Sequence, residues 1–162
     1  MNIICTTEIK APAEAIFEFI EDHRKTKRWM RGLLETSYPE GYNCYNPIGS
    51  RFVQKVREFN REVVYKGEVT GYHKPNYYKF IVNNSYIKLQ IELRLHSNGS
   101  GTKLVYSIRV VDGSFIARVS FKFFSLLSRQ IALRHITSLK KLAEAEMRYR
   151  EINSIIRQER RA

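Results

Sequence analysis

The chain has 162 residues, of which 43% are hydrophobic and 27% are charged. These shares are typical of a globular protein with one core and exclude a disordered, collagen-like or disulfide-scaffold chain. The 28 lysines and arginines exceed the 16 aspartates and glutamates, and the net charge of +12 makes nucleic acid, acidic lipid headgroups and phosphorylated ligands the anionic partners to consider.

The first elements are predicted to be a strand and two short helices. Residues 2–10 are rich in isoleucine and threonine, which favours a strand, and Pro12 with Glu14 marks the start of a helix. Residues 23–30 form a second short helix that carries the single tryptophan and ends at Gly32. The first helix has an apolar face that is expected to be core, made of Ile16, Phe17, Phe19 and Ile20.

Residues 33–111 are predicted to form six strands, separated by turns at 40–41, 46–49, 73–76, 83–84 and 98–101. Side chains alternate across a strand, so every second residue shares a face. The predicted inner face is almost entirely aliphatic or aromatic, whereas the opposite face is mainly basic. The inner-face residues are Phe52, Gln54, Val56, Val63, Tyr65, Val69, Phe80, Val82, Leu89, Ile91, Leu93, Leu95, Leu104, Tyr106, Ile108 and Val110.

The last part of the chain is predicted to be one long helix. After Gly113 the sequence has neither glycine nor proline, and apolar residues recur at spacings of three and four. Strands of about ten residues span roughly 33 Å, which about 22 helical residues would cover. A helix from Phe115 to near Arg160 is therefore too long, and either it breaks or its end projects. We expect residues 1–147 to form the domain and residues 148–162 to form a basic helical extension.

Five short motifs resemble a known family. In chain order they are Ala11-Pro12-Ala13-Glu14-Ala15-Ile16-Phe17 leading to Trp29, Gly49-Ser50-Arg51-Phe52, Gly67-Glu68-Val69 running to Lys74-Pro75, Gly101-Thr102-Lys103-Leu104, and Leu139-Lys140-Lys141-Leu142-Ala143-Glu144. Together with the element order, they resemble the SRPBCC superfamily, the START and birch-pollen-allergen-like group that includes polyketide cyclase/dehydrase-like proteins. The resemblance spans nearly the whole chain.

This resemblance implies an α+β helix-grip fold. In such a fold a curved antiparallel sheet of about seven strands surrounds a long C-terminal helix, and two short helices follow the first strand. The resemblance also implies an apolar cavity between sheet and helix that binds a hydrophobic molecule. Because the superfamily includes carriers, cyclases, hydrolases and lipid-transfer domains, the fold alone does not identify the ligand.

Six residues are predicted to line this cavity: Trp29, Phe52, Gln54, Tyr65, Phe80 and Tyr106. Gln54, Tyr65 and Tyr106 are polar interruptions of an apolar face, and buried polar groups need a hydrogen-bond partner in protein, water or ligand. Trp29 would contribute area and one N–H donor at the cavity rim, although core packing is the more common role of a buried tryptophan. We expect binding or carriage of a hydrophobic or amphipathic molecule, or of a lipid, without a cofactor.

The sequence offers few groups for catalysis, so an enzyme is the less favoured alternative. Glu58 has inward strand parity and would be a general base if it were desolvated, but carboxylates are seldom buried unpaired. Residues 98–101 are glycine-rich yet precede a strand, which indicates a hairpin turn instead of a phosphate loop. We expect neither a metal site nor a cysteine nucleophile, because the spacing of the histidines and cysteines supports neither: His23, His73, His96, His135, Cys5 and Cys44. The alternative enzyme is a polyketide cyclase/dehydrase-like protein with tyrosine and glutamate as proton carriers.

The C-terminal helix is strongly basic, with eleven lysines and arginines against four acids in residues 115–162, which is +7 of the total charge. Its first half, from Phe115 to Leu127, mixes phenylalanines with cations. That composition suits an interfacial helix of a basic peripheral lipid-binding protein, but a helix that closes the cavity with solvated cations explains it better. No nucleic-acid-binding module matches this element order, so a nucleic-acid partner is not expected.

The end of the helix keeps apolar residues among arginines, at Tyr149, Ile152, Ile155 and Ile156. Such a stripe is too short to form a stable helix alone in water, so it is expected either to fray or to bind a partner, which would be a second copy of the protein or an anionic membrane surface.

The sequence also predicts a cytoplasmic protein. Two cysteines are too few for a disulfide framework, and the first residues have neither a basic segment nor a long apolar run. The most apolar stretch, residues 115–136, is not predicted to cross a membrane because charges interrupt it at Arg118, Lys122, Arg129 and Arg134.

Overall fold

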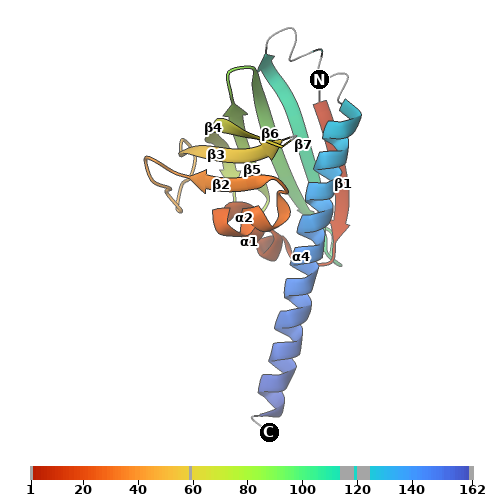
Figure 1. The fold of residues 1–162 in the computed structure, drawn as a ribbon. Helices are drawn as coiled ribbons and strands as arrows, with labels where there is room; N and C mark the ends of the chain where they lie inside the picture. The colour runs from red at the N-terminus through yellow and green to blue at the C-terminus, as the bar shows by residue number, and fades with distance from the viewer. Residues whose placement is uncertain (1, 59, 114–118, 120–124, 161–162) are drawn as a thin grey trace.

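The computed structural model describes residues 2–58, 60–113, 119 and 125–160. Its strands are β1 (Asn2–Ile9), β2 (Leu33–Ser37), β3 (Arg51–Glu58), β4 (Arg61–His73), β5 (Tyr77–Asn83), β6 (Ile87–Ser97) and β7 (Thr102–Gly113), and its helices are α1 (Ala13–Glu21), α2 (His23–Trp29) and α4 (Ser125–Glu159) (Figure 1). This order confirms the predicted α+β helix-grip fold.

The seven strands form one antiparallel sheet in the order β1-β7-β6-β5-β4-β3-β2. Strands β2 to β7 follow one another as a meander, and β1 pairs with the last strand, so that Cys5 faces Tyr106 across the ladder. The sheet curves, and β2, β3 and β4 run across the direction of β1 and β7 (Figure 1). The β3–β4 turn, which lacks a glycine or proline signal, includes Asn60 with φ of 63°, a conformation that asparagine tolerates better than most residues.

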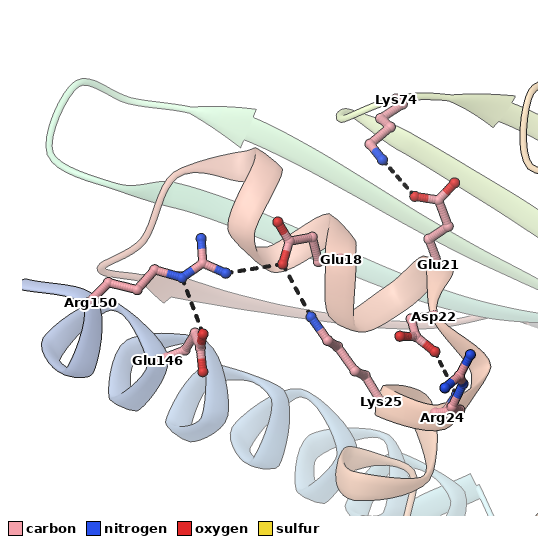
Figure 2. A network of polar contacts seen from close by, with 8 residues as sticks. All are labelled: Glu18, Glu21, Asp22, Arg24, Lys25, Lys74, Glu146 and Arg150. Carbon is pink, nitrogen blue, oxygen red and sulfur yellow. Dashed lines mark hydrogen bonds and ion pairs between the residues drawn. The ribbon is translucent and has the colours of Figure 1, made fainter. Parts of the chain in front are cut away.

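Helices α1 and α2 cover one end of the inner face. The apolar face of α1 is buried as predicted, including Ile16, Phe17 and Phe19. The side chain of Asp22 caps α2 by accepting a hydrogen bond of 2.8 Å from the Arg24 backbone N–H (Figure 2). The buried hydroxyl of Thr26 lies near the last carbonyl groups of α1, 3.3 Å from that of Phe19, which joins the two helices.

Helix α4 lies beside β1 and also packs against α1 and α2 (Figure 1). Its buried side consists of Ala132, His135, Ile136, Leu139 and Ala143. Helix α4 continues without interruption from Ser125 to Glu159. Its end projects beyond the domain, which is one of the two outcomes that the length comparison allowed. The expected start of this helix at Phe115 lies outside the described residues, as do the side chains of the phenylalanines that suggested an interfacial helix. No helix of the described part is long and apolar enough to cross a membrane.

Ion pairs fasten α4 to α1 near the point where it leaves the domain. Arg150 donates to Glu146 one turn earlier and to Glu18 of α1, each at 3.1 Å, and Lys25 of α2 donates to Glu18 at 3.2 Å (Figure 2). Burial alone would raise the pKa of Glu18, but the hydrogen bonds and charges of Lys25 and Arg150 outweigh it and lower that pKa. The carboxylate of Glu18 therefore connects α1, α2 and α4.

Candidate functional site

The two ends of the sheet's inner face differ in how completely they are covered. Beneath α1 and α2 the face is closed, and residues such as Val69 and Leu93 are fully buried. Toward the β3–β4 turn, and along β6 and β7, the same face stays partly exposed. Its apolar residues there, which we call the apolar patch, are Val56, Val63, Ile87, Leu89 and Ile108.

The closed end contains a cavity of about 30 Å³. That volume accommodates one or two water molecules, whereas sites for organic ligands are roughly ten times larger or more. Four of the six residues predicted to bind ligand line it: Trp29, Phe52, Gln54 and Phe80. The other lining residues are Ile20, Glu21, His23, Thr26, Met30, Thr36, Tyr38, Tyr78 and Leu93.

Trp29 is buried and connects three helices. Its indole N–H donates a hydrogen bond of 2.8 Å to the carbonyl of Phe19 at the end of α1, and its ring meets that of His135 of α4 edge to face at 6.2 Å. These contacts are those of core packing, and the same residue also lines the cavity. Burial lowers the pKa of His135, although a contact of 3.4 Å between its Nε2 and the carbonyl of Arg31 opposes that shift.

Phe52, Phe80 and Gln54 pack on the sheet side of the cavity. The rings of Phe52 and Phe80 lie 5.8 Å apart at an interplanar angle of 70°. The amide Nε2 of Gln54 donates a long hydrogen bond of 3.5 Å to the hydroxyl of Thr36 on β2. Because this geometry is at the weak limit for a hydrogen bond, the amide of Gln54 is suited to exchange that partner for another polar group.

A cluster of tyrosines lies next to the cavity, made of Tyr38, Tyr42, Tyr72 and Tyr78. Burial is the largest reason why the pKa of each phenol is raised, so all four remain neutral. The hydroxyl of Tyr72 donates to Glu21 at 2.7 Å. Lys74 donates to the other oxygen of Glu21 at 2.8 Å (Figure 2). The hydroxyl of Tyr42 is buried and has no hydrogen-bond partner within the described part of the chain.

Tyr38, Tyr78 and Glu21 line the cavity but were not predicted to do so from the sequence. Tyr78 shares the strand parity of Phe80, so extending the alternation by one step would have included it. Tyr38 follows β2 in a loop without periodicity, and Glu21 lies on the polar side of an amphipathic helix. No local pattern identifies either of these two residues.

Tyr65 and Tyr106 do not line the cavity, and they lie apart from each other. Tyr65 is buried on β4 and donates a hydrogen bond of 3.0 Å to the carboxylate of Glu58, at the end of the sheet that carries the apolar patch. Burial raises the pKa of Tyr65, and the charge of Glu58 raises it further. Tyr106 is buried on β7, where burial, with a smaller effect of Cys5, raises its pKa. Strand parity thus identified the correct face for both residues but not their positions along it.

Other chemistry is sparse in the described residues. Cys5 is buried and Cys44 is exposed, and burial raises the pKa of the Cys5 thiol despite an opposing charge from Arg129. No three histidine, cysteine, aspartate or glutamate side chains of the described residues come together as metal ligands.

Comparison with known proteins agrees with this fold. The family described as polyketide cyclase / dehydrase and lipid transport matches residues 5–144. No curated protein matches the sequence.

Solved structures resemble the chain at low sequence identity. TTHA0849 from Thermus thermophilus is 13% identical with a TM-score of 0.71, over 90% of this chain and 99% of that one. Ara h 8.0201 is 10% identical with a TM-score of 0.64, over 90% and 98% of the two chains. DynU16, from the dynemicin biosynthetic locus, is 14% identical with a TM-score of 0.64, over 88% of this chain and 47% of its own. At these identities the similarity concerns the fold.

The family match covers most of the chain, and the helix-grip architecture accounts for the five sequence motifs. The chain therefore belongs to the polyketide cyclase / dehydrase and lipid transport family of the SRPBCC superfamily.

Proposed function

We propose that the protein binds a hydrophobic or amphipathic small molecule, such as a lipid, against the apolar patch of the sheet. The observation that carries this proposal is the partial exposure of Val56, Val63, Ile87, Leu89 and Ile108 on a face that is otherwise core. Each square ångström of apolar surface removed from water contributes about 25 cal/mol, so a ligand that covers the patch gains affinity from it. The family description, which names lipid transport, agrees with such a ligand.

A polar group of the ligand would meet Tyr65. Its hydroxyl lies beside the patch and already has an acceptor in Glu58 at 3.0 Å, so it offers lone pairs to a donor or can change partner to a ligand carbonyl. Because burial keeps the phenol protonated, this recognition does not depend on pH in the physiological range.

The cavity adjoins the apolar patch along β3. Phe52, Gln54 and Val56 alternate on one face of that strand, with the first two at the cavity and the third in the patch. We assign to the cavity the inner end of the same site, reached by longer ligands when its side chains move apart. Trp29, Phe52 and Phe80 then contact the inner end of the ligand, and Gln54, the cross-strand partner of Tyr65, lies between that end and the phenol.

Two neighbouring valines provide a matched test. Val63 belongs to the apolar patch, whereas Val64 is exposed on the opposite face of the same strand. Binding is measured with the neutral fluorescent probe N-phenyl-1-naphthylamine and by its displacement with fatty acids. Val63→Gln is expected to weaken binding about fivefold or more, because it places an amide on the patch, and Val64→Gln is expected to have no effect. Equal effects of the two substitutions, with folding verified by circular dichroism, would contradict the proposal.

The hydrogen bond between Tyr65 and Glu58 also favours a second candidate function, acid–base catalysis. A neutral phenol can donate a proton to a carbonyl while the neighbouring carboxylate accepts one, which are the two transfers needed for dehydration or cyclisation of a polyketide-like substrate. Both groups come from adjacent strands at one end of the inner face.

Tyr65→Phe distinguishes the two functions. The molecule that copurifies with the protein is extracted into organic solvent, identified by mass spectrometry and incubated with each variant. If the protein is a carrier, the extracted molecule stays unchanged, and Tyr65→Phe retains most of the affinity for it. An enzyme converts it, with loss of water or ring closure, and loses that conversion with the hydroxyl while binding persists.

A further inference from the structure

Helix α4 has a second side, which points away from the sheet. A helix turns by about 100° per residue, so residues three, four and seven apart share a side. Opposite the buried residues Ala132, Ile136, Leu139 and Ala143 runs a row of exposed residues that we call the outer face. It consists of Ile131, Arg134, Lys141, Ala145, Arg148, Tyr149, Ile152, Ile155 and Ile156.

The far part of the outer face is apolar and has no partner in the described chain. Tyr149, Ile152, Ile155 and Ile156 are 64%, 56%, 49% and 42% exposed. Arg150, which contacts Glu18, is the last residue of α4 with an ion pair to the rest of the described domain. The side of the projecting helix that continues the buried side of α4 is polar instead, with Arg150, Asn153, Ser154 and Arg157. The apolar residues therefore face away from their own domain.

The near part of the outer face is cationic, with Arg134, Lys141 and Arg148 exposed. Two of the acidic side chains among the described residues of α4 already accept hydrogen bonds. Glu144 accepts a hydrogen bond of 2.9 Å from the Lys10 backbone, and Glu146 accepts one of 3.1 Å from Arg150. Glu151 and Glu159 are exposed; Glu151 lies to the side of the row, and Glu159 lies on the same side as the isoleucines, at the end of α4.

We propose that the outer face of α4 docks the protein on an anionic membrane surface. The isoleucines and Tyr149 would enter the headgroup region, and the three cations would lie against lipid phosphates, which is the arrangement of an interfacial amphipathic helix. A second copy of the chain fits less well, because the net charge of +12 repels it. Nucleic acid would use the cations but gain nothing from aliphatic isoleucines, since it is bound through phosphate contacts and aromatic stacking.

This docking is independent of the ligand proposed above, because it uses the solvent side of α4 and none of the apolar patch. The full chain is mixed with phosphatidylcholine vesicles that contain about 30% phosphatidylserine, and bound protein is separated by flotation. Binding is expected to these vesicles and not to pure phosphatidylcholine. It is expected to fall by about tenfold or more when salt is raised from about 0.1 M to 0.5 M, because screening shortens the range of the attraction. Failure to bind the anionic vesicles overturns the proposal.

Paired variants separate the apolar and the electrostatic contributions. Ile152→Ser with Ile156→Ser should reduce vesicle binding about tenfold or more, because the buried apolar area is lost. The matched control replaces two exposed isoleucines elsewhere, Ile4 and Ile48, by serine and should bind normally. Equal loss in both pairs overturns the proposal.

Neutralising Arg134, Lys141 and Arg148 to glutamine removes three charges from the outer face. The control removes three exposed lysines from the sheet, Lys66, Lys88 and Lys103, and leaves the same net charge. The variant with the three substitutions in the helix is expected to lose vesicle binding, and the control is expected to keep it. An equal loss in both variants overturns the docking surface.

Sedimentation analysis of the full chain tests the remaining alternative, a second copy of the protein. A concentration-dependent dimer that Ile152→Ser with Ile156→Ser abolishes, without anionic vesicle binding, assigns this face to a second copy instead.

Discussion

Phe52 lies on the inner face where its cross-strand partner, Gly67, has no side chain. A Cβ placed on Gly67 would come within 2.2 Å of the Phe52 ring, closer than any real contact. The far end of the ring therefore occupies the space beside Gly67, and the ring lines the cavity together with Phe80. The glycine is required here for space and not for backbone conformation.

Gly67→Ala should destabilise the fold by about 1–3 kcal/mol, because the ring of Phe52 must leave its position. Denaturant unfolding measures the change in the free energy of unfolding. Phe52→Leu removes the obstructing ring atoms, so the double variant should lose less than the sum of the two single variants. Additive losses would show that the two residues do not interact in this way.

His135 makes stability depend on pH. Burial lowers its pKa in the folded state below the value of 6.5 expected when the chain is unfolded. Between the lowered pKa and 6.5 the unfolded chain binds a proton that the folded chain does not, so the free energy of unfolding falls as the pH is lowered through this range.

Urea unfolding of the wild type and of His135→Gln at pH 7.5 and 5.5 tests this effect. The wild type is expected to lose more stability than the variant over this interval, by up to about 1.4 kcal/mol for each pH unit in which only the unfolded state is protonated. The difference between the proteins removes the contribution of carboxylates that both share. Identical pH dependences would contradict the assignment.

At the scale of elements, α4 combines two functions along one helix. As far as Arg150 it closes the sheet and is fastened to α1, and from Glu151 to Glu159 it extends into solvent by about 13 Å. The packing that stabilises α4 is confined to the first part. The second part gains no stability from packing, and an isolated helix of its length is marginal in water.

Deletion of residues 151–162 is expected to leave the thermal midpoint almost unchanged. The retained Arg150–Glu18 pair is exposed and contributes about 0–1 kcal/mol at most, and the deleted residues bury little surface. Deletion of residues 139–162, which removes the buried Leu139 and Ala143, should unfold the domain. A large loss of stability in the shorter deletion would show that the projecting helix is part of the core.

The elements themselves were largely predictable from local patterns. Alternating residues placed Phe52, Gln54 and Phe80 on the inner face, and the length comparison predicted a helix that outruns the sheet. The β3–β4 turn was not predicted, because Asn60 adopts its left-handed conformation without a glycine or proline nearby. The loop that carries Tyr38 and Tyr42 has no period, so its contribution to the site depends on contacts that no local pattern encodes.

At the scale of the molecule, helices α1 and α2 determine which part of the inner face is open. They close one end around a cavity of about 30 Å³ and leave the apolar patch partly exposed at the other. Strand parity assigned Tyr65 and Tyr106 to the same face as Phe52, but a curved sheet separates residues that share a face. The position of each residue relative to the covering helices is a long-range property, which explains why only four of the six predicted residues meet at the cavity.

The proposed ligand-binding surface is the apolar patch. Methyl-detected NMR of protein labelled at isoleucine, leucine and valine tests it directly, by titration with N-phenyl-1-naphthylamine and with a fatty acid. Saturable shifts are expected for the methyl groups of Val56, Val63, Ile87, Leu89 and Ile108, while those of Val53 and Val64 on the opposite face of β3 and β4 stay unchanged. Shifts confined to Val53 and Val64, or a patch that does not respond to any of these molecules, would contradict this site.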